Sequence, residues 1–319
     1  HYPLRRQRQM CIRDSYKADP LRGQRWRILF AEQAPDIQWR AWPELGDPTE
    51  IRYLAAWQAP ENLHQLLPNL QVLFALSAGV DQLDISGLPQ NLPVVRLLDP
   101  GITQGMCEYA SFAVLGLHRD MLRYRQQQAE RRWQAHPLLP AHKRRVGIMG
   151  LGLQAKQILA TLQPYGFALS GWARSQHQIP GVQCFAGSEQ LPAFLGQCDI
   201  LLCVLPLTEQ TQGILDRKLF AHLPKGAAVI NMGRGGHLVE QDLLEALASG
   251  QLSAAVLDVL EQEPAGPAHP FWDHPQILLT PHIAAMTQPD SAFAGLLDNI
   301  RRHQRGEPML GQIDRQRGY

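Results

Sequence analysis

The chain contains a glycine-rich turn with the spacing G-x-G-x-x-A. Residues 147–155 read Gly-Ile-Met-Gly-Leu-Gly-Leu-Gln-Ala, after a short apolar run and before apolar residues at helical spacing. Gly150 and Gly152 permit a tight turn and close approach of the backbone to a pyrophosphate. Leu153 and Gln154 open the following helix, whose free N–H groups favour phosphate oxygens. We predict that these four residues bind a dinucleotide, the alternative being a purely structural turn.

The next apolar run indicates which dinucleotide. An NAD site places an acidic residue about 20 positions beyond the glycine motif, where it binds the ribose 2′-hydroxyl. Here the run ends in Ala173-Arg174-Ser175, with no acid. A guanidinium fork matches the oxygens of a 2′-phosphate. Arg174 and Ser175 therefore predict that NADP(H) is preferred and NAD(H) possible, unless this is an ordinary solvated turn.

The spacing of the histidines and of the cysteines gives no sign of a metal site. His136, His269 and His274 each precede a proline, which is typical of turns, and no H-x-x-x-H pattern or carboxylate cluster has ligand spacing. We expect no metal. The five cysteines form no C-x-x-C pair and their number is odd. Both facts argue against a zinc knuckle or a disulfide framework and favour a reducing, cytoplasmic location.

Short β-rich segments alternate with helical stretches along most of the chain. This order predicts parallel sheets covered by helices on both faces. The expected strands are 26–31, 37–42, 53–57, 71–76 and 93–97, then 145–149, 168–172, 199–205, 227–232, 254–259 and 276–279. We predict an α/β fold of two doubly wound parallel-sheet domains, the cofactor domain inserted into the substrate domain.

The expected domain boundaries follow from these two series. Residues 103–286 form a dinucleotide-binding (Rossmann) domain, and residues 26–102 with 287–319 form a substrate-binding domain. One long helix is expected over 103–132, apolar in its first half and polar in its second. Another is expected over 291–305.

The first residues differ in composition from the rest. Residues 1–27 hold eight basic and two acidic residues, so the remaining chain has a small net negative charge although the total is +1. A nucleic-acid arm and an Arg-rich targeting peptide are possible interpretations, but we favour a disordered or non-native leader over 1–25. The acidic body gives no reason to expect nucleic acid or a membrane as partner. The longest apolar run, 200–207, is too short to cross a bilayer.

From residue 26 onward the chain resembles the D-isomer-specific 2-hydroxyacid dehydrogenases. Each matching motif is weak alone, but their order behind a dinucleotide fingerprint is specific. The segments that carry the resemblance are 77–81 (SAGVD), the glycine motif, 231–236 (NMGRGG), 258–264 (DVLEQEP), 280–282 (TPH) and the tail 311–319.

The resemblance implies a catalytic trio of Arg234, Glu263 and His282, spaced 29 and 19 residues apart. An imidazole can donate a proton near neutral pH, so His282 suits protonation of a carbonyl oxygen. A neighbouring Glu263 would favour the charged imidazolium and orient the ring. Arg234 can bind the carboxylate of a keto acid and stabilise negative charge on its carbonyl oxygen. The alternatives are a solvated cation, a surface charge and a packed turn residue.

Further contacts are implied by the same resemblance. Backbone N–H groups of Ala78 and Gly79 would bind the substrate carboxylate, unless this is a plain strand-to-helix turn. Trp57 would line the substrate pocket, or simply fill the core. The residues expected at the nicotinamide are Leu205, Pro206 and Asp258.

The implied activity is reduction of small 2-keto acids, glyoxylate to glycolate and hydroxypyruvate to D-glycerate, by hydride transfer from NAD(P)H. The family also implies a homodimer formed through the helix expected over 103–132. The alternative function is a dinucleotide-sensing, corepressor-like binding protein on the same scaffold, since a fold alone does not decide function.

Overall fold

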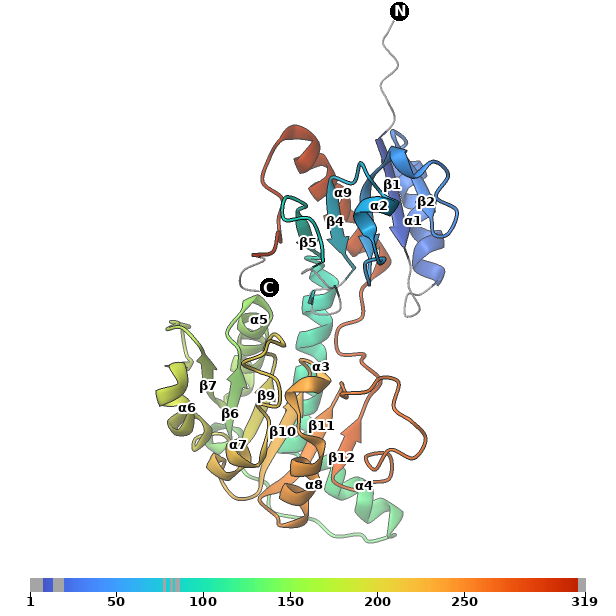
Figure 1. Ribbon diagram of the computed structural model, residues 1–319. Coiled ribbons are helices and arrows are strands. Elements are labelled where there is room, and N and C mark those ends of the chain that lie inside the picture. Colours follow the sequence, from blue (N-terminus) through green and yellow to red (C-terminus); the bar gives the residue numbers. More distant parts are fainter. Residues whose placement is uncertain (1–7, 14–19, 77–78, 81–82, 84–86, 315–319) are drawn as a thin grey trace, which may run out of the picture. The chain divides into compact units, whose positions relative to one another are not determined.

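The computed structural model describes residues 8–13, 20–76, 79–80, 83 and 87–314. The chain divides into two compact units. Unit 1 contains the described residues up to Ile102 and from Thr287 onward, and unit 2 is Thr103–Met286. Each unit has its own parallel sheet (Figure 1).

Unit 2 is built around a sheet of seven parallel strands. Along the chain these are β6 (Arg145–Met149), β7 (Ala168–Ala173), β8 (Gln183–Ala186), β9 (Ile200–Cys203), β10 (Ala227–Asn231), β11 (Leu252–Leu257) and β12 (Ile277–Leu279). Their order across the sheet is β12-β11-β10-β9-β6-β7-β8. The sheet therefore grows in opposite directions from β6, which is the doubly wound arrangement, and ligands of such sheets bind outside the strands' carboxyl ends near this switch point.

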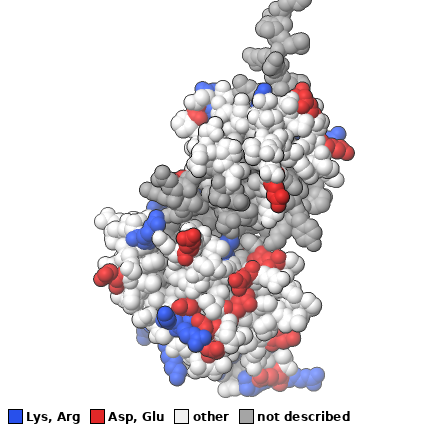
Figure 2. Space-filling view, viewed as in Figure 1, with Lys and Arg blue, Asp and Glu red and all other residues white. Residues whose placement is uncertain are grey.

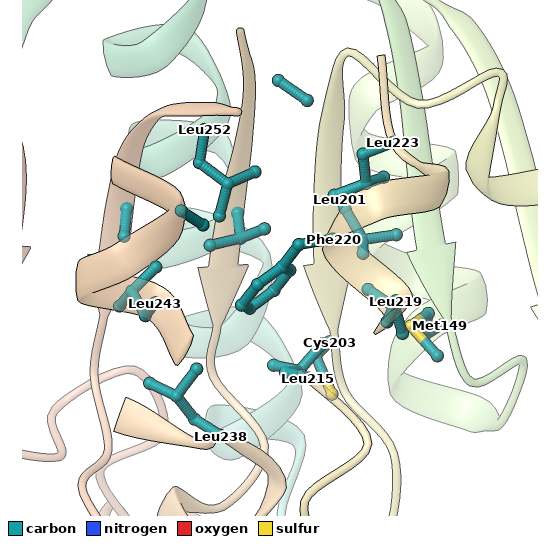
Figure 3. Packing of buried hydrophobic residues seen from close by; sticks show 14 of the residues in the cluster. Met149, Leu201, Cys203, Leu215, Leu219, Phe220, Leu223, Leu238, Leu243 and Leu252 are labelled. Carbon is teal, nitrogen blue, oxygen red and sulfur yellow. The ribbon is translucent and has the colours of Figure 1, made fainter. Parts of the chain in front are cut away.

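Helices cover both faces of this sheet (Figure 1). The helices of unit 2 are α3 (Pro100–His118, which begins in unit 1), α4 (Met121–Ala129), α5 (Leu153–Leu162), α6 (Gly187–Leu195), α7 (Arg217–His222) and α8 (Glu240–Ala248). Helices α6, α7 and α8 share one apolar cluster with the sheet. In Figure 3, Phe220 of α7 lies at its centre, among Leu201, Leu243 and Leu252. Because the strands between these layers are buried on both faces, their sequences are near-continuous apolar runs.

Unit 1 contains a five-stranded parallel sheet in its described residues. The strands are β1 (Arg8–Arg13), β2 (Ile37–Ala41), β3 (Ile51–Ala56), β4 (Val72–Ala75) and β5 (Val94–Arg96), in the order β2-β1-β3-β4-β5. The helices are α1 (Pro20–Gln33), α2 (Leu63–Leu66) and α9 (Pro289–Arg305). Phe30 of α1 and Phe293 of α9 meet edge to face, with ring centroids 4.8 Å apart. The fold class predicted from the sequence is confirmed: both sheets are parallel and doubly wound.

The expectation of a disordered leader over 1–25 is wrong for residues 8–13 and from 20 onward, whereas its being non-native stays a prediction. Residues 8–13 form β1, which pairs in parallel with β2 on one side and β3 on the other. Residues 20–25 open α1. The basic composition suggested a solvated segment, but strand pairing uses backbone groups, which composition does not report. The other leader residues lie outside those described.

The strand expected over 26–31 is also wrong, because this segment belongs to α1. Trp26, Leu29, Phe30 and Ala34 are all buried, whereas Ile28 is 48% exposed. Burial at i, i+3, i+4 and i+8 follows the period of a helix rather than the alternation of a strand.

The single helix expected over 103–132 is broken into α3 and α4. Asp120 lies between them with φ of 55°, in the left-handed region that ends a helix and that Asp tolerates better than most residues. The sheet also has one more strand than predicted, the short edge strand β8, which pairs with β7. No helix in the described ranges is long and apolar enough to span a bilayer.

The pairing of β1 with β2 and β3 can be tested by deletion and by substitution. Deleting residues 1–13 removes both ladders of an interior strand, so we expect the melting temperature of unit 1 to fall by several degrees or the deleted chain to fail to fold. Met10→Pro, which removes an N–H from a strand paired on both sides, should also lower it, whereas Met10→Leu should not. Thermal unfolding followed by circular dichroism measures the effect. An unchanged melting temperature in Met10→Pro would contradict the pairing.

Candidate active site

The carboxyl ends of the strands in unit 2 carry the predicted site residues. In sheet order, His282 follows β12, Asp258 follows β11, Arg234 follows β10, Leu205 and Pro206 follow β9, Gly150 follows β6 and Arg174 follows β7. Because all these strands are parallel, their carboxyl ends lie at one edge of the sheet. Residues up to 132 positions apart in sequence are thus gathered at the edge where such sheets bind ligands.

Asp258 is a buried carboxylate at this edge of the sheet. Its side chain is 2% exposed and its carboxylate accepts three hydrogen bonds from the turn after β12. The donors are the hydroxyl of Thr280 and the backbone N–H of Ile283 to Oδ1, at 2.6 and 2.9 Å, and the N–H of Ala284 to Oδ2, at 2.8 Å. Burial raises the pKa of Asp258, and the hydrogen bonds from Thr280, Ala284 and Ile283 oppose that rise. The expected role of Asp258 at the nicotinamide stays a prediction beside this observed one.

His282 lies in the turn that Asp258 holds. Its backbone N–H donates to the carbonyl oxygen of Asp258 at 2.8 Å and to that of Thr280 at 3.0 Å. Its φ of 56° is left-handed, which costs a residue with a Cβ about 1–2 kcal/mol. Such a conformation persists only where surrounding contacts impose it.

His282 and Glu263 form the central hydrogen bond of the site. Nδ1 of the imidazole lies 2.8 Å from Oε2 of Glu263, and the two side chains are 32% and 21% exposed. An ionised carboxylate only accepts hydrogen bonds, so Nδ1 carries the hydrogen and Nε2 is left to exchange a proton. The resemblance implied this pair, and the structure brings the two side chains together.

Glu263 is in turn held by the backbone of its own loop. The N–H of Leu260 donates to its second oxygen, Oε1, at 3.1 Å. The same loop packs directly against Gly235, where a Cβ would stand only 1.8 Å from the carbonyl carbon of Leu260. Only glycine fits there, so the loop that carries Glu263 lies against the residue next to Arg234.

The loop of Arg234 is shaped by buried polar side chains. Asn231, fully buried at the end of β10, donates from Nδ2 to the carbonyl oxygen of Arg234 at 2.9 Å and accepts from the N–H of Gly233 at 3.2 Å. Nδ1 of His237, also fully buried, accepts from the N–H of Arg234 at 3.1 Å. These contacts fix the backbone from which the half-buried guanidinium of Arg234 projects.

The glycine turn fits the diphosphate part of a dinucleotide. Gly150 has φ of +98°, and a Cβ there would lie 3.2 Å from the carbonyl oxygen of Val204. Gly152 precedes α5 with ordinary φ, and the space where its Cβ would stand is open, so its backbone can be approached closely. Leu153 and Gln154 form the first turn of α5, with N–H groups free for phosphate oxygens.

The residues that follow β9 and β7 lie beside the glycine turn. The backbone of Leu205 lies between Gly150 and Gly233. Its Cα is 3.5 Å from where a Cβ of Gly150 would stand, and its carbonyl oxygen is 3.2 Å from where a Cβ of Gly233 would stand. Pro206 follows it. Arg174 and Ser175 are exposed directly after β7, whose last residues approach the turn: Gly150 N–H donates to the carbonyl oxygen of Trp172 at 2.8 Å. A dinucleotide with a 2′-phosphate fits the residues present.

Of the residues predicted to contact the substrate, Arg234 lies in unit 2 and the others do not. Trp57 and Gly79 belong to unit 1, and Ala78 lies outside the described residues. Their role stays a prediction. Within the described ranges, no group of three or more His, Cys, Asp or Glu side chains is placed to hold a metal ion.

Sequence reasoning missed the residues that support the site. Tyr109 and Thr280 make contacts that join segments far apart in the chain, and no local pattern signals them. Asn231 bonds within its own loop, to Gly233 and Arg234. Gly235 had a signal, because a pair of consecutive glycines in NMGRGG suggests a close backbone approach.

Comparison with known proteins gives one consistent result. Residues 112–284 match the family model "D-isomer specific 2-hydroxyacid dehydrogenase, NAD binding domain". A glyoxylate/hydroxypyruvate reductase A of Serratia proteamaculans is 42% identical over 308 residues, which cover 93% of this chain and 96% of that protein. A reductase of the same name from Yersinia enterocolitica is 40% identical over 305 residues, covering 93% and 96%.

Solved structures are similar over nearly the whole chain. A D-isomer specific 2-hydroxyacid dehydrogenase from Xanthobacter autotrophicus Py2, in complex with NADPH and MES, gives a TM-score of 0.90 at 37% identity, covering 97% of this chain and 99% of that one. An NADPH-dependent glyoxylate/hydroxypyruvate reductase from Sinorhizobium meliloti, in complex with NADP and sulfate, gives 0.90 at 33% identity, covering 97% and 100%.

Proposed function

Because the chain belongs to the D-isomer-specific 2-hydroxyacid dehydrogenases, we propose that it reduces glyoxylate and hydroxypyruvate with NADPH, using Arg234, Glu263 and His282. It is an NAD(P)H-dependent oxidoreductase of keto acids, as the resemblance implied. The observation that carries the proposed mechanism is the 2.8 Å contact between His282 and Glu263 at the carboxyl edge of the sheet.

The reaction requires a hydride at the carbonyl carbon and a proton at the carbonyl oxygen. Bound NADPH supplies the hydride. His282 donates the proton from Nε2 as the carbonyl oxygen becomes an alkoxide, and the product is the 2-hydroxy acid. The hydrogen bond from Nδ1 to Glu263 keeps the ring oriented and stabilises its charged form before transfer.

Arg234 acts on the other end of the substrate. Its guanidinium can bind the carboxylate with two parallel hydrogen bonds and stabilise charge on the carbonyl oxygen. The buried contacts of Asn231 and His237 to its backbone limit its freedom before substrate binds. Preorganised charge of this kind lowers the barrier because little reorganisation is needed during the reaction.

The relatives' names support the choice of substrates and of cofactor. The bacterial relatives are named for glyoxylate and hydroxypyruvate, and the similar structures hold NADPH or NADP. Arg174 and Ser175 stand where an NAD enzyme has an acid. The alternative of a binding protein without activity is not favoured, since these relatives are named as reductases.

We propose a homodimer formed through the segment from α3 to α4 and the residues that follow. Trp133 is fully exposed, and Phe112, Met121 and Leu138 are 56%, 47% and 50% exposed. Apolar side chains gathered along one segment are typical of a surface that another chain covers.

Other partners and the location are also part of the proposal. On the face shown in Figure 2, described basic side chains are interspersed with acidic ones, whereas nucleic-acid binding uses clustered basic groups. We therefore propose no nucleic-acid or membrane partner. Four described cysteines are free thiols, which supports a reducing cytoplasm.

The trio is tested by rate and pH dependence. Proton donation requires charged His282, so reduction should slow as pH rises, and oxidation of the hydroxy acid should accelerate. His282→Ala should lose about 10²–10⁴-fold in kcat while NADPH affinity is nearly kept. Glu263→Gln should lower kcat, because the imidazole loses the charged acceptor that orients it. NADPH absorbance at 340 nm measures the rate, and exposed His222→Ala is the matched control. Normal kcat and pH profile in His282→Ala would exclude this proton donor.

Cofactor preference is tested at Arg174. Arg174→Ala should raise KM for NADPH about 10- to 100-fold, which corresponds to about 1.5–3 kcal/mol for a lost charged hydrogen bond. KM for NADH should barely change, which makes NADH the internal control. Equal kcat/KM for the two cofactors in the unmodified protein would contradict the assignment.

The dimer is tested by mass in solution. Light scattering coupled to size exclusion should give two chains per particle. Trp133→Ser should raise the dissociation constant of the dimer about tenfold or more, because a buried aromatic side chain contributes strongly to an interface. Trp272→Ser, at a half-exposed tryptophan elsewhere in unit 2, should not. A monomer at every concentration would refute the proposal.

A further inference from the structure

A chain of hydroxyl groups connects helix α3 with the turn of His282. The phenol of Tyr109 in α3 lies 2.6 Å from Oγ1 of Thr280, and Oγ1 of Thr280 lies 2.6 Å from Oδ1 of Asp258. Tyr109 is 8% exposed and Asp258 is 2% exposed, so water does not compete for these bonds. Asp258 then binds Ile283 and Ala284, the two residues that follow His282.

The direction of these hydrogen bonds follows from the number of hydrogens. Ionised Asp258 only accepts, so Thr280 donates its single hydroxyl hydrogen to Asp258. Thr280 can then only accept from Tyr109, and the phenol must be the donor. Burial raises the pKa of Tyr109 to about 12, so the phenol keeps this hydrogen at neutral pH.

We infer that Tyr109 is a positioning residue for His282, acting through Thr280 and Asp258; this rests on the proposed role of His282. The phenol orients the hydroxyl of Thr280 toward Asp258, and Asp258 holds the turn on both sides of the histidine. His282 needs such support because its left-handed φ of 56° is unfavourable for a residue with a Cβ. When the turn relaxes, the imidazole moves from its 2.8 Å contact with Glu263. Tyr109 itself does not touch the reacting atoms.

The inference predicts a specific pattern among four variants. Tyr109→Phe keeps the ring, which packs on Phe112, and removes only the donor. It should lower kcat for keto-acid reduction about three- to tenfold, the effect of one net hydrogen bond, with KM for the keto acid unchanged. Thr280→Val should lower kcat at least as much, whereas Thr280→Ser, which keeps the hydroxyl, should stay near the unmodified value. Tyr165→Phe, at a half-exposed tyrosine of unit 2, is the matched control.

A double variant separates positioning from general packing. If Tyr109 acts through Thr280, adding Tyr109→Phe to Thr280→Val should cost no further activity, whereas independent effects would multiply. The imidazole signal of His282 in NMR, assigned by its loss in His282→Ala, should shift in Tyr109→Phe and Thr280→Val. It should not shift in Tyr165→Phe or Thr280→Ser.

The inference is overturned if Tyr109→Phe leaves both kcat and the His282 signal as in the unmodified protein, or if the two substitutions multiply. Failure of the proposed function gives a different result. A chain that does not reduce keto acids, or whose His282→Ala variant keeps full rate, refutes the catalytic assignment. In that case the NMR signal alone decides whether Tyr109 positions His282: a shift supports it and an unchanged signal refutes it.

Discussion

The site depends on a carboxylate that is buried and still needs hydrogen-bond donors. Asp258 directly follows β11 and is only 2% exposed, and a buried polar group without partners costs free energy. The turn after β12 supplies these donors from Thr280, Ile283 and Ala284. That requirement fixes the turn, which places His282 beside Glu263. The arrangement of the proposed proton donor is therefore a consequence of satisfying one buried acid.

Much of the fold and of the site follows from sequence because parallel sheets obey simple rules. Apolar runs separated by helices indicate a doubly wound sheet, and the carboxyl ends of its strands share one edge. Arg234 and His282 each follow a predicted strand, so their presence at that edge needs no knowledge of tertiary contacts. The motif around Gly150 is equally local, since the tight turn, the strand and the helix all lie within a few residues.

The rest was not predicted, either because it depends on long-range pairing or because a period in the sequence was misread. The ladder of β1 with β2 and β3 is made by backbone groups that basic side chains do not report. The segment 26–31 has burial at helical spacing, a signal present in the sequence and wrongly read as a strand. Tyr109 and Thr280 are 171 residues apart, and only packing of α3 near the sheet edge reveals their contact.

The same acid shows why such a site is held by several groups at once. Burial raises the pKa of Asp258 above its value in the unfolded chain. As pH rises from the lower to the higher of these two pKa values, the carboxyl group ionises more readily in the unfolded chain, so the free energy of unfolding falls. The left-handed φ of His282 adds about 1–2 kcal/mol of backbone cost. An apolar residue at 258 would avoid the first cost, but it would leave the donors of the turn without an acceptor. Only a carboxylate accepts from a hydroxyl and two backbone N–H groups of one short turn, and this keeps the histidine in a conformation it would not adopt alone.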